Sequence, residues 1–355
     1  MKRIQIFGFL LLLVFGISPV AAERKPSWFS LRVSQSTWEP AAFNEIDKLR
    51  QINLQSSAIF GGGLLATPAD YFSYGTNRQS MPFAELILSI GGEFNRGNLV
   101  LGYGATSPSG LNNTGLSYTD SQTFNIVSRV TSNQYNIFQS SDLKHYTLGY
   151  DHELYPFRGE KGFLKDLGFI LGIQFARDEF QGSTFNTGQA QTDSGTSGSI
   201  TSSSISSLSS FGTTEHNITT GDLQLGLIYR MDLAENLELE AGAKFGMGIG
   251  QSNAIIKTQS LVTLGSSTFP LESNSEYSSD GDLRTSRLHL GVAYRFTEVL
   301  TINTYYSVTN RYYTPTSGSV KAGGLISIES QATGPFYTQK DKMSNIGIEF
   351  QARFN

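Results

Sequence analysis

The sequence predicts an all-β fold, a single antiparallel transmembrane β-barrel of about ten strands, and three observations lead to this prediction. Residues 345–354 alternate between apolar even positions and mostly polar odd positions, and similar segments recur along the chain. The connections between these segments are short and long in turn. After residue 22, no apolar run approaches the roughly 20 residues of a spanning helix. Strands in lipid must close into a barrel, because lipid cannot satisfy the hydrogen bonds of an open sheet edge.

The N-terminus carries the pattern of a secretory signal peptide over residues 1–22. Two basic residues precede an apolar run over 4–17, and small residues precede the polar Glu23. The alternative is a retained anchor, but the run is short for a membrane span. We therefore expect cleavage after residue 22 and a barrel domain over 23–355. The chain has no cysteine, which excludes a lipid-modified N-terminal cysteine and a disulfide framework.

We expect the first three strands at 28–34, 83–90 and 99–103. In each of them apolar residues occupy every second position, which places them on one face of the strand. The sequence Arg-Gly-Asn over 96–98 is a tight-turn signal that separates the second strand from the third.

The next four strands are expected at 146–150, 167–176, 223–229 and 237–249. The last two form the best-defined hairpin, because long alternating runs flank a short turn over 232–236. The first of the four alternates tyrosine and leucine with polar residues.

The last three strands are expected at 288–296, 302–308 and 345–354, with a short turn over 297–299 between the first two. Segments 52–65 and 124–130 are the alternative: if both are strands, the barrel has about twelve, which is again an even count. We prefer ten because neither segment has a cleanly lipid-like face.

Long polar segments alternate with the short turns. We expect loops near 38–80, 107–142, 178–220, 251–283 and 311–342, and short turns near 95–98, 155–166, 232–236 and 297–299. The run over 181–214 is rich in Ser, Thr and Gly, so it has little apolar surface to bury and is expected to be solvated and mobile. A soluble barrel would not be expected to sort its loop lengths by side in this way.

These features resemble the bacterial outer-membrane β-barrel proteins over the whole mature length. The resemblance is carried by the Val20-Ala21-Ala22 cleavage region, the alternating strands, the loop asymmetry and Phe354. It implies a location in the bacterial outer membrane, with short periplasmic turns, long extracellular loops, and outer-membrane lipid and the barrel assembly machinery as partners. One departure is that Asn355, not the aromatic Phe354, ends the chain. The Ser-rich loops and the turn over 154–159 look similar to lineage-restricted barrels of leptospires.

The charged residues argue against a nucleic-acid partner and predict a lumen that contains paired charges. With 26 basic and 30 acidic residues the formal net charge is −4, and no concentrated basic face suggests nucleic acid. A barrel of ten strands is only slightly wider than the eight-strand size that side chains fill, so paired charges should occupy its lumen, as a plug or around a narrow polar pore. By parity the expected lumen charge network contains Arg32, Glu85, Glu93, Asp222, Arg230, Glu238, Glu240, Lys244, Arg287, His289, Arg295, Glu349 and Arg353. Asp151, Glu153 and His145 share this parity, and Glu349 and Arg353 are each expected to meet an opposite charge.

Candidate catalytic residues are weak. The four histidines are His145, His152, His216 and His289, and none has the spacing of an omptin-like Asp-His pair or of the His-Ser pair of outer-membrane phospholipases. No zinc or calcium pattern is present. We therefore predict no catalytic, metal or cofactor residues, and no enzyme.

Two functions remain open. The chain is expected to be a narrow porin-like channel for small polar solutes or a scaffold for surface-exposed loops. The alternative is a surface adhesin or ligand-binding barrel that takes an extracellular ligand on its loops. Aromatic residues over 71–74 and 311–313 are candidate contacts, or interfacial anchors. A hydrolase is the last choice.

Overall fold

The computed structural model describes residues 27–40, 78–92, 94–107, 112–123, 126–196, 199–264, 266–323, 328–331 and 338–354. The expected signal peptide, the segment 52–65, Glu93 and Asn355 lie outside these described residues. Apart from one short 3-10 helix, η1 (Phe163–Asp166), the regular structure within them is β-strand. Among these residues, no helix is long and apolar enough to cross a membrane.

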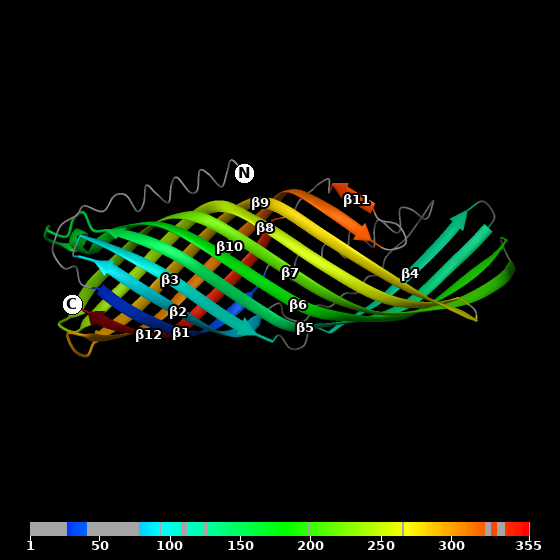
Figure 1. Cartoon of the computed structure of the whole chain (residues 1–355), viewed down its shortest axis with the longest axis horizontal. Coiled ribbons are helices and arrows are strands. Elements are labelled where there is room, and N and C mark those ends of the chain that lie inside the picture. The colour runs from blue at the N-terminus through cyan, green and yellow to red at the C-terminus, as the bar shows by residue number, and fades with distance from the viewer. Residues whose placement is uncertain are drawn as a thin grey trace.

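Ten strands close into an antiparallel barrel, as predicted (Figure 1). The described residues form twelve strands in all: β1 (Ser27–Glu39), β2 (Gln79–Gly91), β3 (Asn95–Thr106), β4 (Asn112–Thr123), β5 (Ile126–Leu154), β6 (Leu167–Thr196), β7 (Ser199–Ala234), β8 (Leu237–Leu264), β9 (Ser267–Arg295), β10 (Leu300–Gly323), β11 (Ile328–Gln331) and β12 (Gln339–Phe354). The ring runs β1-β2-β3-β5-β6-β7-β8-β9-β10-β12 and returns to β1, while β4 pairs with β5 and β11 with β10 outside it. Most of the segment 124–130 therefore belongs to β5 and does not add a strand to the ring.

The last strand closes the barrel against the first. β12 and β1 pair antiparallel from Phe354 opposite Ser27 to Lys342 opposite Glu39, which places Glu349 directly opposite Arg32. The same strand pairs on its other side with β10. Because both edges of β12 are paired, closure leaves no open edge between the chain's first and last strands.

Side chains alternate between the outer surface and the lumen. In β2, every odd position is buried and every even position is exposed, including Leu86, Leu88 and Ile90. Outward positions are mostly apolar over one band around the barrel, as expected for strands that cross a hydrocarbon core about 30 Å thick. The band covers residues 29–33, 84–90, 99–103, 146–154, 169–175, 223–229, 239–249, 288–294, 300–308 and 346–354. We call these the membrane-spanning segments.

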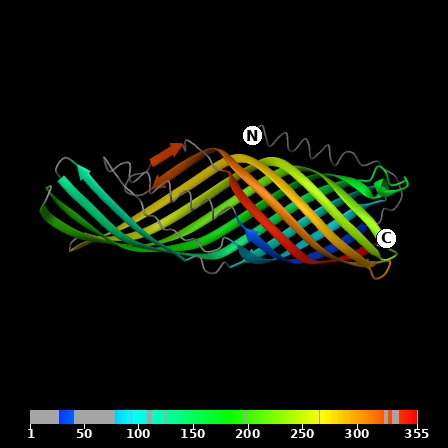
Figure 2. The ribbon, with the colours of Figure 1, turned by 180° about the vertical axis from the view of Figure 1, so that it is seen from behind.

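The strands on one side of the barrel continue far beyond this band. Figures 1 and 2 show β5 to β9 running past the ends of β1, β2, β3 and β12 on the same side. We call the continued parts, residues 126–142, 178–196, 199–220, 252–264, 267–282 and 311–323 with β4 and β11, the β-extension. It is a paired sheet, because β6 and β7 remain in register from Leu167–Tyr229 to Thr196–Ser199 with one irregularity.

The β-extension differs from the expectation of loops. Within the Ser-, Thr- and Gly-rich run over 181–214, the described residues 181–196 and 199–214 are in strand, and much of 107–142, 251–283 and 311–342 is strand as well. The physical reason is that hairpin pairing satisfies backbone groups whatever the side chains are. Low apolar content therefore predicts solvent exposure but does not exclude a paired backbone.

The pairing in the β-extension predicts slow amide exchange. Amides over 181–196 and 202–214 should exchange as slowly as paired strands do, because their hydrogen bonds must open first. Hydrogen–deuterium exchange with peptide mass analysis of the micellar protein would measure this, with 223–229 as the internal reference. Complete exchange within seconds over 181–214 would show that the run is an unpaired loop.

Candidate functional site: the barrel lumen

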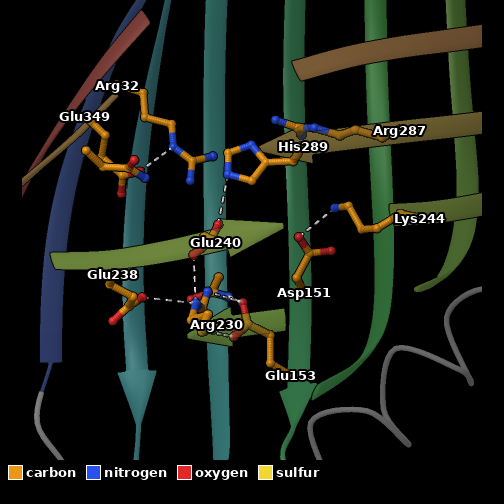
Figure 3. A network of polar contacts seen from close by, with 12 residues as sticks. Arg32, Asp151, Glu153, Arg230, Glu238, Glu240, Lys244, Arg287, His289 and Glu349 are labelled. Carbon is orange, nitrogen blue, oxygen red and sulfur yellow. Dashed lines mark hydrogen bonds and ion pairs between the residues drawn. The ribbon is translucent and has the colours of Figure 1, made fainter. Parts of the chain in front are cut away.

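A layer of ion pairs crosses the middle of the lumen (Figure 3). Arg32 on β1 donates from Nε to Glu349 Oε2 on β12 at 2.8 Å. Glu85 on β2 lies between two guanidinium groups, with Arg32 Nη1 and Arg287 Nη2 each 3.8 Å from one of its oxygens. Since Arg287 is on β9, this contact joins opposite sides of the barrel. The layer alternates in sign, as burial of several charges in one place requires.

A second layer is built around Arg230 on β7. Its Nη1 lies 2.6 Å from Glu153 Oε2 on β5, and its Nε lies 2.7 Å from Glu240 Oε2 on β8. Glu238 is more distant, with Oε1 at 4.0 Å from Nε. Tyr155 donates its hydroxyl to Glu153 and accepts a hydrogen bond from Arg230. One guanidinium thus binds two carboxylates on two other strands (Figure 3).

Two further ion pairs lie in the lumen with these layers. Lys244 Nζ on β8 lies 2.7 Å from Asp151 Oδ2 on β5, and the ion pair again crosses the lumen. His289 Nε2 lies 2.9 Å from Glu240 Oε1. Glu240 therefore contacts both His289 and Arg230, which adds His289 to the second layer.

A third layer lies beyond the membrane-spanning segments, at the end of the barrel that bears the β-extension. Arg311 Nη2 is 2.6 Å from Asp178 Oδ2 and 2.9 Å from Asp341 Oδ2. His145 Nδ1 lies 2.5 Å from the other Asp178 oxygen, and Trp38 donates from Nε1 to Asp341 at 3.0 Å. These five residues, from β1, β5, β6, β10 and β12, form what we call the mouth cluster.

Electrostatics in the mouth cluster favour a charged carboxylate. Burial alone would raise the pKa of the Asp178 carboxyl, but the Arg311 guanidinium and His145 together hold that pKa below its ordinary value. Asp178 is therefore ionised at neutral pH and depends on Arg311 for compensation.

An apolar cluster packs next to the mouth cluster. Seven inward side chains form it, each no more than about one-twentieth exposed: Trp38, Met81, Phe83, Leu143, Phe180, Ile218 and Met343. The ring centroids of Trp38 and Phe83 lie 5.3 and 5.7 Å from that of His145. The interior at this end is thus closed by apolar packing as well as by ion pairs.

Small residues make room for the charges inside the wall. A Cβ at Gly172 would lie 2.4 Å from Asp151 Oδ1, and a Cβ at Gly246 would lie 2.0 Å from Asp222 Oδ2. Both distances are far below contact, so a side chain at either position would require the carboxylate to move. Glycine therefore leaves the space that the Asp151 and Asp222 carboxylates occupy.

The space left between these layers is small. Asp222 accepts hydrogen bonds from Thr285 at 2.5 Å and from Gln224 at 2.9 Å. Beside it, with Lys244 and Arg311 in its lining, is a cavity of ≈ 10 Å³. That is about the space that a single water molecule needs. The space beside Asp222 at this level of the lumen therefore holds about one water molecule.

The structure brings together nine of the residues expected in the lumen charge network: Arg32, Glu85, Arg230, Glu238, Glu240, Lys244, Arg287, His289 and Glu349. Asp222 faces inward but is held by neutral donors. Arg295 and Arg353 differ from the expectation, because both are exposed at the end of the barrel where the short turns lie. The Arg353 guanidinium lies 5.9 Å from the Trp28 ring centroid, a cation–π contact in place of the expected acidic partner.

Sequence analysis missed Asp178, Arg311 and Asp341 because it assigned their segments to loops. It also missed the apolar cluster because it treated inward positions as polar. The available signal was parity: Met81 and Phe83 share the face of Glu85, and Asp178 shares the face of Gln174.

The histidines have local partners. His216 Nε2 lies 2.7 Å from Ser252 Oγ, and both residues are no more than 2% exposed. A serine nucleophile needs access to its substrate, which this burial does not provide. Within the part of the chain that the structure describes, no group of three or more His, Asp or Glu residues is arranged to hold a metal ion.

No protein-family model and no curated protein sequence matches the chain. Among solved structures it is similar to the outer membrane protease OmpT from Escherichia coli, with 9% identity and a TM-score of 0.42 over 95% of this chain and 99% of that one. It is also similar to the P. putida toluene transporter TodX, with 9% identity and a TM-score of 0.25 over 95% and 91% of the two chains. The Ralstonia pickettii toluene transporter TbuX is similar with 8% identity and a TM-score of 0.21 over 93% of this chain and 90% of that one. Likeness this weak carries no argument about location or activity, and the fold assignment rests on the strand pairing.

The mouth cluster predicts a large loss of stability in Arg311→Leu. Removing this cation leaves the Asp178 and Asp341 carboxylates buried without it, which should cost about 3–5 kcal/mol. Urea unfolding of the micellar protein, followed by tryptophan fluorescence, would measure it. The matched control is Arg177→Leu, which removes an arginine that is half exposed and pairs with Glu179 at 2.8 Å. That exposed pair should contribute less than about 1 kcal/mol. Equal unfolding midpoints for the two variants would contradict the prediction.

Proposed function

We propose that the protein is an integral protein of the bacterial outer membrane whose filled barrel is a rigid scaffold for the β-extension, which binds a ligand outside the cell. In this proposal the short turns face the periplasm, and outer-membrane lipid and the barrel assembly machinery are its membrane partners. The observation that carries the proposal is the packing of the lumen by ion pairs that cross it.

Opening the lumen would separate buried charges. Arg287–Glu85, Lys244–Asp151, Arg230–Glu153 and Arg311–Asp178 each join strands that are not neighbours in the sheet. Breaking one buried pair leaves an uncompensated charge, at a cost of several kcal/mol. A passage for solutes would require several such pairs to break together, which favours a scaffold over a channel.

The β-extension is large for a connection between membrane strands. A strand needs about 9–11 residues to span a membrane, whereas β7 continues over residues 199–222 beyond its apolar segment. At about 3.3 Å per residue, that part is roughly 80 Å long. Segments that a rigid scaffold presents to solvent are a common place for binding, and here they form a paired sheet.

A narrow channel for small polar solutes is the second candidate. The polar interior favours it, since charged side chains occur in all three layers of the lumen. We favour it less because the same side chains occupy the space a solute would need. Hydrolysis is not part of the proposal, since the His216–Ser252 pair is buried.

Planar-bilayer recording separates the first two candidates. The purified wild-type protein is expected to give no conductance above background, because the lumen is filled. The double variant Trp38→Ala, Arg311→Ala removes both components of the closure at the mouth and should raise the frequency of openings. Stable unitary steps from the wild-type protein would establish a channel and end the scaffold proposal.

Shortening the β-extension tests the binding proposal. Replacing residues 187–209 with an Asn-Gly turn keeps the pair Asn186–Ser210 and should leave the barrel folded, as heat-modified mobility on gels would show. The probe is a panel of immobilised extracellular-matrix glycoproteins, to which the wild-type protein should bind and the shortened variant should not. The control replaces residues 262–269 in the same way between Leu261 and Pro270. Equal binding by the wild-type protein and both variants, or no binding by the wild-type protein, would contradict the proposal.

A further inference from the structure

The outer wall of the barrel has a trough over β8 with a volume of ≈ 460 Å³. Its centre is formed by Ala241 and Ala243, two small outward residues in a strand whose other outward residues are large. In register beside Ala243 are Leu227 on β7 and Leu288 on β9. The leucines are about half exposed and project past the alanine between them.

The next row repeats the arrangement. Tyr229 and Leu290 lie in register on either side of Ala241. Two positions beyond Ala243 along β8, the large outward side chain of Phe245 is 66% exposed. On β10, Tyr306 lies in register with Leu290 and continues the wall. The result is a hollow two rows long with apolar sides.

The trough lies within the membrane-spanning segments, so its surroundings are hydrocarbon. Its volume falls within the roughly 300–1,000 Å³ typical of small-molecule sites. Its central lining consists of alanines, leucines and Tyr229. A flexible apolar chain in the trough would be in contact with the lining on three sides and would find few hydrogen-bonding groups. A single acyl chain has the right shape and chemistry to fill it.

We propose that this trough is a binding site for one acyl chain of a phospholipid from the leaflet on the side of the short turns. The position of the trough along the barrel supports this choice of leaflet, since Tyr229 and Ala241 lie within a few residues of the short turn between β7 and β8. Arg295, at the end of β9, is exposed at the same rim, and its backbone N–H donates to Asn236 O at 2.9 Å. An exposed guanidinium at this rim complements the phosphate of a lipid whose chain runs up the trough.

Filling the trough should weaken binding by a measurable factor. Each methylene that loses its contact with the wall lowers the affinity roughly fourfold. Ala243→Leu adds three carbons at the centre of the trough, so it should lower the affinity at least roughly tenfold. Arg295→Gln should lower it less, because most of the contact is with the chain.

Native mass spectrometry of the full-length protein, released from vesicles of phosphatidylethanolamine and phosphatidylglycerol, tests the proposal. The wild-type protein should retain one phospholipid, and Ala243→Leu should lose it. Ala84→Leu is the matched control, because Ala84 is also outward in a membrane-spanning segment but lies in register between Val33 and Tyr103, away from the trough. If Ala243→Leu does not fold, Ala241→Val gives the same comparison with a smaller side chain.

Three outcomes would overturn the proposal. Equal phospholipid retention by the wild-type protein and the folded trough variant would show that the trough does not hold the chain. Retention of lipopolysaccharide in place of phospholipid, when both are supplied, would assign the site to the other leaflet. A wild-type dimer that the trough variant loses, without bound lipid, would assign the trough to a second copy of the chain.

Discussion

The enclosed charges are the constraint on which the rest of this structure depends. A charged side chain inside a barrel loses its water and is stable only with close partners. Glu85 between two arginines and Arg311 between two aspartates satisfy this requirement by alternating sign. Since many of the partners lie on strands that are not neighbours, the ion pairs fix the distance between opposite walls. Close packing of the inward carboxylates also accounts for Gly172 beside Asp151 and Gly246 beside Asp222, where a Cβ would meet a carboxylate oxygen.

Sequence periodicity predicted the ten strands and most of their inward charges, and it predicted that Glu349 would meet an opposite charge. It did not predict that Arg287 meets Glu85 across the barrel, because such a pairing depends on the tilt and stagger of strands far apart in the chain. Asp178, Arg311 and Asp341 were missed for another reason. Their segments are polar enough to suggest loops, and backbone pairing that continues a hairpin leaves little trace in composition.

The molecule joins two different solutions to the problem of sheet edges. The barrel has no open sheet edge, since β12 pairs with both β1 and β10. The β-extension is not closed: of the described strands, β4 pairs only with β5 and β11 only with β10. The β-extension continues the strands of the closed barrel, since β6 and β7 pair from the barrel to Thr196–Ser199 with one irregularity. A rigid closed barrel that carries a β-extension with open edges suits the binding of other molecules to the β-extension.

The mouth cluster also has a consequence for the order in which the protein forms. Trp38 and Asp341 are separated by 303 positions in the chain, and Arg32 and Glu349 by 317. Contacts of such long range require the greatest loss of chain entropy before any stabilisation is gained. Arg311 can reach both of its aspartates only when β10 and β12 are paired and β6 lies across the lumen from them. The mouth cluster therefore forms only when the ring of strands is complete. In a barrel that has not yet closed, the Asp178 and Asp341 carboxylates would still lack their pairing with Arg311.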